Sequence, residues 1–166
     1  MDKNNWSFPN LVGSEKQVVW ADKIRRDFAK YYSSLGGEPG ESEIRIKKAV
    51  AIAVSAKFWI ENRDYCEKGS WENMTQVLKN LQSLIGICQP WYNDLNQSEF
   101  EEILKVKKSK IQGLRIDKAG IVACCKQFGE NLSVEMKPEI DKQEKIRKQK
   151  EDQEILEWEL NQRSPI

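Results

Sequence analysis

The sequence predicts an all-α fold: a compact helical domain with a buried central helix, followed by a charged C-terminal helical arm. Apolar residues recur at spacings of three and four along several segments, which is the pattern of helices with one buried face. A serine or an aspartate precedes most of these segments at a position suited to a helix N-cap. Beyond Pro138 the chain consists mostly of charged and amide-bearing residues. We therefore expect a globular domain over residues 1–136 and a solvent-exposed arm over residues 137–166.

The first helix is expected over residues 14–35. Ser14 is suited to the N-cap, and Gln17 completes a capping box, in which two side chains satisfy backbone N–H groups that a helix start leaves free. An apolar stripe follows at helical spacing: Trp20, Ile24, Phe28, Tyr31 and Leu35. Trp6 and Phe8, which lie among polar residues before this helix, are expected to pack against it.

The central helix is expected over residues 43–64. Its middle, residues 49–60, is apolar on nearly every side, which is typical of a helix that other helices enclose. Lys57 interrupts this run, and the run is shorter than the ~20 residues that span a bilayer, so we expect no membrane segment. A third, amphipathic helix over residues 71–86 would pack on the first two, and Trp91-Tyr92 would fold back on the core.

Shorter helices are expected in the rest of the globular domain. Ser98 would cap a fourth helix, and Asp117 would cap a small helix that closes before Gly129. Residues 133–136 would form a short extended piece. A small strand element within residues 106–136 is therefore an open possibility.

The arm carries opposite charges four residues apart, which stabilise an exposed helix. Its apolar residues gather near its end: Ile155, Leu156, Trp158 and Leu160. Two interpretations stay open for the arm. It is a frayed helix, or it docks through Trp158 on a partner or on a second copy of the chain, because an exposed tryptophan beside leucines usually finds a surface.

Composition excludes several kinds of chemistry. The chain contains 166 residues, of which 39% are hydrophobic and 32% charged, with a net charge of +1 and no histidine. The missing histidine removes Ser-His-Asp and Cys-His catalysis and the Cys/His zinc sites. The four cysteines form no C-x-x-C pair, and the first residues show no secretory pattern. We expect reduced thiols in a cytoplasmic protein, with no catalytic residue, no metal and no cofactor.

A basic run is the strongest electrostatic feature of the globular domain. Lysine ammonium groups at this density could neutralise backbone phosphates without reading a base sequence. Cations are also favourable at a helix C-terminus, so a solvated helix end is the competing explanation. The candidate nucleic-acid or partner-binding residues are Lys105, Lys107, Lys108, Lys110, Arg115 and Lys118.

Polar residues on the first two expected helices form a second candidate site. They either build an intramolecular ion-pair network that orients the two helices, or they form a recognition surface beside Trp20 and Trp59. With Trp158, the candidate partner-binding residues are Lys16, Gln17, Arg25, Asn62 and Arg63.

Two motifs in this region resemble a pair found in small uncharacterised proteins of phages, plasmids and bacterial mobile regions. The first, from Leu11 to Arg25, reads L-x-G-S-E-K-Q-V-x-W-A-x-x-I-R, and the second is A-K-F-W-I-E-N-R at residues 56–63. In those proteins the second motif resembles A-x-x-W-I-x-N-R. The resemblance covers about the first 65 residues and carries no established activity. It implies a small intracellular protein of a mobile element that touches a nucleic-acid-handling machine.

These observations lead to two functional hypotheses. The first is a non-enzymatic interaction protein of a phage or mobile element, which binds and modulates a larger nucleic-acid-handling machine, as counter-defence and anti-CRISPR inhibitors do. The second is a DNA- or RNA-binding accessory protein that uses the basic segment 105–118. The expected partner is a protein or a nucleoprotein complex, with homo-oligomerisation through the arm and direct nucleic-acid contact as open alternatives.

Overall fold

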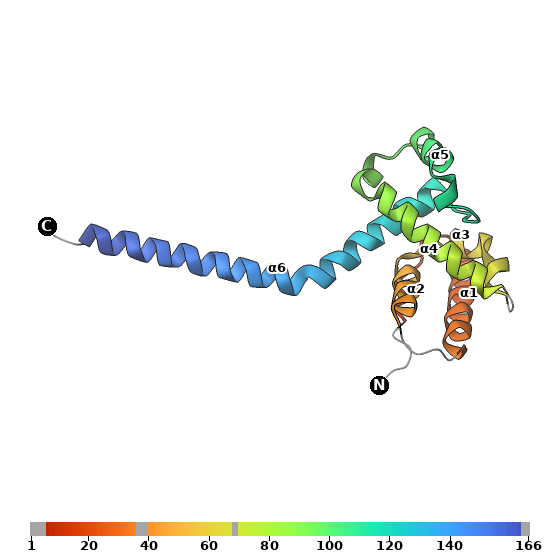
Figure 1. The fold of residues 1–166 in the computed structure, drawn as a ribbon, viewed down its shortest axis with the longest axis horizontal. Coiled ribbons are helices and arrows are strands. Elements are labelled where there is room, and N and C mark those ends of the chain that lie inside the picture. The colour runs from red at the N-terminus through yellow and green to blue at the C-terminus, as the bar shows by residue number, and fades with distance from the viewer. Residues whose placement is uncertain (1–5, 36–39, 68–69, 164–166) are drawn as a thin grey trace. The chain divides into compact units, whose positions relative to one another are not determined.

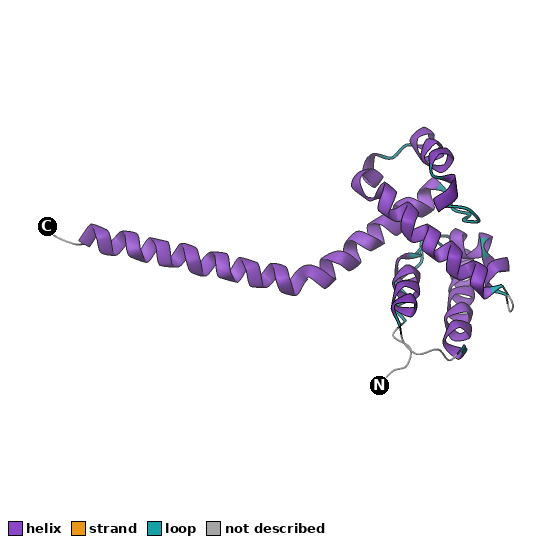
Figure 2. Ribbon diagram, in the orientation of Figure 1, coloured by secondary structure: helices purple, strands orange, loops and turns teal. Residues whose placement is uncertain are grey.

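The computed structural model describes residues 6–35, 40–67 and 70–163. Regular structure in these ranges is helical, as Figures 1 and 2 show, which confirms the all-α prediction. The strand element expected within residues 106–136 is absent from the described chain, whose one strand-like feature is a parallel bridge between Val12 and Ser55. The α-helices are α1 (Glu15–Ser34), α2 (Glu41–Ile52), α3 (Ala56–Glu61), α4 (Trp71–Cys88), α5 (Gln97–Val106) and α6 (Lys118–Arg163). Short 3₁₀ turns are η1 (Arg63–Cys66), η2 (Gln89–Asp94) and η3 (Lys108–Lys110).

The chain divides into two compact units, Met1–Phe128 and Gly129–Ile166. The change in composition instead predicts a division between residues 136 and 137. In the first unit α1 packs against α3 and η1, α2 packs on α4, and α4 also contacts the three 3₁₀ turns. No helix within the described ranges is long and apolar enough to cross a membrane.

Helix α1 begins with the predicted capping box. The Gln17 backbone N–H donates to the Ser14 hydroxyl oxygen at 3.2 Å, and the Ser14 N–H donates to the Gln17 side-chain oxygen at 3.0 Å. The buried side of the helix is rotated from the predicted stripe. Trp20 is 48% exposed, and the buried residues are Ala21, Arg25, Phe28 and Ala29.

The residues that precede α1 pack on it as expected. The Trp6 indole N–H donates to the Ser33 hydroxyl at 2.9 Å, and its ring meets the Tyr32 ring edge-on at 5.9 Å. The Phe8 ring lies beneath two guanidinium groups, 5.2 Å from that of Arg25 and 4.5 Å from that of Arg26. Cation–π contacts of this kind are favourable, and they hold the N-terminal segment along α1.

The prediction of one central helix over residues 43–64 is wrong, because the chain breaks between α2 and α3. Val12 inserts beside the break: its N–H donates to the Val54 carbonyl at 2.7 Å, and its own carbonyl accepts from the Ala56 N–H at 3.0 Å. The Ala53 carbonyl accepts from the buried indole N–H of Trp59 at 2.7 Å. Buried backbone groups must find partners, and these contacts replace the helical ones that the break removes.

The break starts a new helix with its own cap. The Ser55 hydroxyl accepts from the Phe58 backbone N–H at 3.2 Å, so Ser55 is the N-cap of α3. Phe58 and Trp59 are then fully enclosed in the core, together with apolar side chains of α4. The buried centre that the sequence predicted therefore exists, but it consists of two helices, α2 and α3, with a break between them. We call residues 53–55, whose backbone pairs with Val12, the corner.

Two other helix limits differ from the predictions. Helix α5 is capped by Asn96, not Ser98, because the Asn96 side-chain oxygen accepts from the Glu99 N–H at 2.8 Å. Asp117 does precede α6, with its carboxylate accepting from the Gly120 N–H at 2.8 Å. Helix α6 does not close before Gly129, and it contains Pro138. The cost of about 1 kcal/mol for a glycine and about 3 kcal/mol for a proline in a helix is offset by the good helix formers around them.

Gly13 is expected to be required for the contact at the break. A Cβ atom added at Gly13 would lie 2.9 Å from the Ala56 Cβ, closer than side-chain carbons approach one another. We expect Gly13→Ala to lower the free energy of unfolding by about 1–3 kcal/mol through this overlap, measured by urea denaturation. The matched control is Gly86→Ala, since Gly86 lies within α4 with open space around it. That change should stabilise the protein by up to about 1 kcal/mol. Equal effects of the two variants would contradict the expectation that the close contact at Ala56 requires a glycine at residue 13.

Candidate functional site

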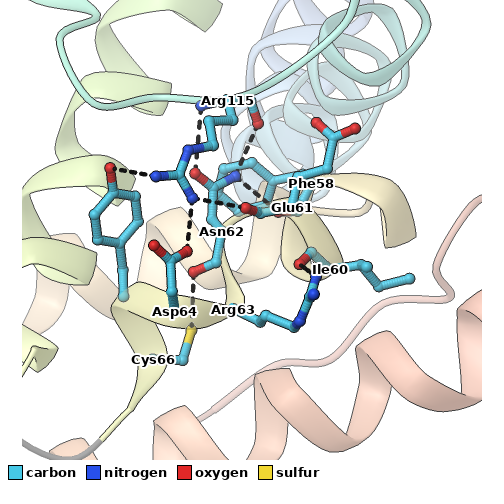
Figure 3. A network of polar contacts seen from close by, with 9 residues as sticks. Phe58, Ile60, Glu61, Asn62, Arg63, Asp64, Cys66 and Arg115 are labelled. Carbon is cyan, nitrogen blue, oxygen red and sulfur yellow. Dashed lines mark hydrogen bonds and ion pairs between the residues drawn. The ribbon is translucent and has the colours of Figure 1, made fainter.

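Asn62 joins the end of α3 to the segment that precedes α6 (Figure 3). Its side chain is fully buried, and its amide N–H₂ donates to the Phe58 carbonyl at 2.7 Å and to the Arg115 carbonyl at 2.8 Å. Its side-chain oxygen accepts from the Arg115 backbone N–H at 3.3 Å. Asn62 thereby provides hydrogen-bond partners for the backbone N–H and carbonyl groups of Arg115, 53 residues away along the chain. The contacts are those of a side chain that holds two segments together.

Arg115 is engaged in the same network. One guanidinium nitrogen donates to the Asp64 carboxylate at 2.6 Å and to the Glu61 carbonyl at 2.9 Å, and another donates to the Tyr65 hydroxyl at 3.1 Å (Figure 3). The hydrogen bond from Arg115 holds the pKa of Asp64 below its usual value. Lys118 donates to the Leu95 carbonyl at 3.2 Å. The two C-terminal members of the predicted basic site therefore have internal partners.

Arg25 is also held inside the first unit. It is 2% exposed and donates to the Pro9 carbonyl at 2.7 Å and to the Asp22 carboxylate at 2.6 Å. Burial lowers the pKa of Arg25, and the neighbouring Asp22 opposes that effect. Its Nε atom is buried without a hydrogen-bond partner. Arg25 fixes the N-terminal segment on α1, and its ion-pair partner, Asp22, lies outside the second predicted cluster.

The remaining residues of the second predicted cluster lie at the surface or serve a cap. Gln17 completes the capping box of α1, and Lys16 is exposed beside it. Arg63 is exposed, donates to the Ile60 carbonyl at 2.7 Å, and places its guanidinium 5.1 Å from the centre of the Trp20 ring. Trp59, on the other hand, is completely buried. The structure thus separates the cluster into internal contacts and one exposed pair, Trp20 with Arg63.

The four lysines at the end of α5 are placed differently. Lys105 lies in the last turn of α5 and Lys107 is its C-cap, followed by Lys108 and Lys110 in η3. Three of them are exposed and Lys107 is half-buried. Within the described ranges, none of the four ammonium groups forms an ion pair. They form a lysine cluster, a name used below for these four residues alone.

Beside the lysine cluster lies a shallow apolar groove of about 390 Å³. Trp91, expected to fold back on the core, is instead 50% exposed and lines this groove, while Tyr92 packs against the core. The groove is lined by Ile87, Trp91, Glu99, Glu102, Ile103, Val106 and Lys107. Trp91 departs from helical geometry inside η2, at φ −139° and ψ 23°, and the sequence held no signal for this bend except the preceding Pro90.

The second unit carries the other exposed apolar group. Ile155, Leu156 and Leu160 are 56–57% exposed and Trp158 is 63% exposed. A shallow hollow of about 330 Å³ lies between Ile155, Trp158 and the carboxylate-bearing Glu151 and Glu154. We call residues 151–160 the arm tip. The arm tip contains no lysine or arginine. Its acidic residues are Glu151, Asp152, Glu154, Glu157 and Glu159.

The cysteine thiols have raised pKa values. Burial raises the pKa of Cys66, Cys124 and Cys125 to about 12, and it also raises that of Cys88. All four are free thiols. Since the thiolate is the nucleophilic form, these groups are weak nucleophiles at neutral pH. Among the residues that the structure describes, no group of three or more histidine, cysteine or carboxylate side chains is placed to hold a metal ion.

Comparison of the chain with protein families, with curated proteins and with solved structures finds no match.

Charge reversal distinguishes the internal arginine from the exposed one. Arg25→Glu should destabilise the fold by about 3 kcal/mol or more, because it buries a carboxylate without a partner cation beside Asp22, which keeps only Arg26 as its partner. Arg63→Glu should cost less than about 1 kcal/mol, since it removes only exposed contacts, the cation–π contact with Trp20 and the hydrogen bond to the Ile60 carbonyl. Urea denaturation followed by circular dichroism measures both. A folded Arg25→Glu variant of unchanged stability would show that the buried contacts do not orient α1.

The Asp64–Arg115 pair should contribute a small, pH-dependent amount to the free energy of unfolding. The pKa of Asp64 is lower in the folded state than its ordinary value of 3.8. The pair therefore stabilises the fold above the unfolded-state pKa, and this contribution is lost as the pH falls through the folded-state pKa. Because both side chains are about half exposed, the contribution should stay below about 1 kcal/mol. Asp64→Asn should lack this component, so the stability difference between it and the parent protein should shrink between about pH 5 and pH 2.

Proposed function

We propose that this protein is a non-enzymatic interaction protein that docks on a larger partner through the arm tip. The single observation that carries the proposal is the exposed group of Ile155, Leu156, Trp158 and Leu160 on a helix whose other side chains are mostly polar. Tryptophan in such a group is the residue type most enriched among interface hot spots. A chain without histidine and with thiols of raised pKa also has few groups suited to catalysis.

The charge of the arm tip indicates the kind of partner. Five carboxylates surround the apolar residues between residues 151 and 160, where the sequence holds no lysine or arginine, although one of them, Glu151, pairs with Arg147 at 2.7 Å. Opposite charges across an interface speed association and select partners. The partner surface should therefore offer an apolar pocket with basic residues around it, and proteins that handle nucleic acids carry such basic surfaces. An acidic helix that occupies one would compete with the nucleic acid for it.

The resemblance to proteins of phages and mobile elements fits this proposal. An inhibitor of host defence, of the counter-defence or anti-CRISPR kind, acts by occupying a surface on a nucleic-acid-handling machine. This chain has the parts for that mode of action, namely a core that holds the fold and an exposed tip with charge opposite to such a surface. The mobile-element context and the inhibitory role are the finer parts of the proposal.

Trp158→Ala should remove partner binding without affecting the fold. We expect at least a tenfold loss of affinity, because a central tryptophan commonly contributes about 2 kcal/mol or more on truncation. Stability should change by less than about 0.5 kcal/mol, since the side chain is exposed. The measurement is affinity capture from a lysate of cells that carry the gene, with and without nuclease, followed by binding of the purified partner.

The matched control is Ile146→Ala, which shortens an exposed apolar residue of the same helix outside the arm tip. Its binding should equal that of the parent protein. A partner that survives nuclease treatment and is lost only with Trp158→Ala supports the proposal. A partner that Trp158→Ala still captures, or that nuclease releases, contradicts it.

A further inference from the structure

Within the described ranges the lysine cluster forms no ion pair, whereas several other cations of the first unit do. Arg115 binds Asp64, Lys57 binds Asp117, and Arg26 binds Asp22. From residue 103 to residue 116 the sequence contains no acidic residue. A local excess of positive charge therefore exists in a chain whose net charge is only +1.

The lysine cluster is carried by an anchored turn. The Lys107 backbone N–H donates to the Ile103 carbonyl and the Lys110 N–H donates to the Lys107 carbonyl, at 2.9 and 2.8 Å. The Asn80 amide on α4 donates to the Gln112 carbonyl at 2.6 Å. These bonds fix the backbone that presents the lysines. A ligand therefore binds without first ordering that backbone, which favours affinity.

The exposed tryptophan and one member of the lysine cluster, Lys107, meet at the groove. Lys107 lines it together with the Trp91 ring and the apolar side chains of Ile103 and Val106. An ammonium group can bind a phosphate, and an indole face can stack on a nucleobase. Only a single strand, a loop or an end exposes base faces for stacking, since a duplex covers them.

The carboxylates of the groove determine which part of a nucleic acid could enter it. Glu99 and Glu102 line the groove with Trp91 and Lys107. They repel phosphate, so the backbone would run along the lysines while a base enters the apolar part. A carboxylate accepts hydrogen bonds from amino groups, which every common base except thymine and uracil carries on its pairing edge.

We propose that the lysine cluster and Trp91 form a binding site for single-stranded nucleic acid, with phosphates on the lysines and a base stacked on Trp91. This site lies in the first unit and does not depend on the partner docking proposed for the arm tip. The residues it uses are a subset of the predicted basic site, from which the engaged Arg115 and Lys118 are excluded, with Trp91 added.

The test measures fluorescence anisotropy of labelled oligonucleotides with the full chain. The probes are a single strand of mixed sequence of about 12 nucleotides, within the site sizes of single-strand binders, and a duplex of the same length, at salt concentrations from roughly 50 to 200 mM. The first variant replaces Lys105, Lys107, Lys108 and Lys110 with glutamine. The second is Trp91→Ala.

We expect the parent protein to bind the single strand more tightly than the duplex. The lysine variant should bind at least tenfold more weakly, and its slope of log K against log salt should be shallower by roughly 0.7 for each phosphate that it no longer neutralises. Trp91→Ala should weaken single-strand binding roughly five- to hundredfold, which is the range for loss of one stacked base, and leave the salt dependence unchanged.

Two matched controls distinguish a loss of binding at this site from the effect of losing positive charge anywhere in the chain and from loss of folding. Replacing Lys142, Lys145, Lys148 and Lys150 with glutamine removes the same charge from the second unit, and Trp158→Ala removes another exposed tryptophan. Both should retain binding, and circular dichroism should show unchanged helix content in every variant. The proposal is overturned by absence of single-strand binding at low salt, by equal losses in the two lysine variants, or by a Trp91→Ala variant that binds like the parent protein.

The competing occupant is an acidic amphipathic peptide helix, which would place its apolar side chains in the groove and its carboxylates on the lysines. A labelled peptide with the sequence of residues 151–160 serves as the probe in the same assay. Binding of this peptide, abolished in the lysine variant and in Trp91→Ala, together with no binding of oligonucleotides, would assign the groove to protein docking and overturn the proposal.

Discussion

The pairing of Val12 with the corner between α2 and α3 is the contact on which the first unit depends. It supplies backbone partners where the helix breaks, and it brings Gly13 against Ala56. The same corner receives the beginning of α6. A Cβ atom on Gly120 would lie 3.1 Å from the Ser55 hydroxyl, and the backbone of Val54 and Ser55 lowers the pKa of the Cys124 thiol against the larger effect of burial. Three distant segments therefore meet at this corner.

This arrangement gives the two motifs of the sequence a physical meaning. The first motif supplies the close approach at Gly13, the capping box and the buried Arg25, and the second supplies the opposing Ala56, the core Trp59 and the Asn62 bridge. Their residues touch one another or the same neighbours. The motif pair is thus accounted for by packing, and the exposed Trp20–Arg63 contact is the part of it that faces solvent.

Some features that depend only on neighbouring residues were predicted correctly from the sequence, and features that depend on distant residues were not. The capping box at Ser14 needs only Gln17, so the start of α1 was predicted correctly. The break after Ile52 depends on Val12, 40 residues away, and the apolar run around it favours a continuous helix although it contains Ser55, the N-cap of α3. The charge of Arg115 was visible in the sequence, but its engagement by Asp64 and by the Glu61 carbonyl follows from the tertiary fold. The exposure of Trp91 was not predictable, because the bend that exposes it lies in backbone angles.

The long separation along the chain between the parts of the corner has a consequence for how the protein folds. The Asn62–Arg115 bonds join residues 53 positions apart, and Ile121, Cys124 and Cys125 complete the core that α1 begins. Contacts between distant residues must wait until the intervening loop has closed, and they slow folding. During synthesis, the corner at Ala53–Ser55 therefore emerges from the ribosome well before the residues that cover it. Until Cys125 follows, the part of the apolar run that α6 covers stays exposed, and exposed apolar surface in an incomplete chain favours aggregation.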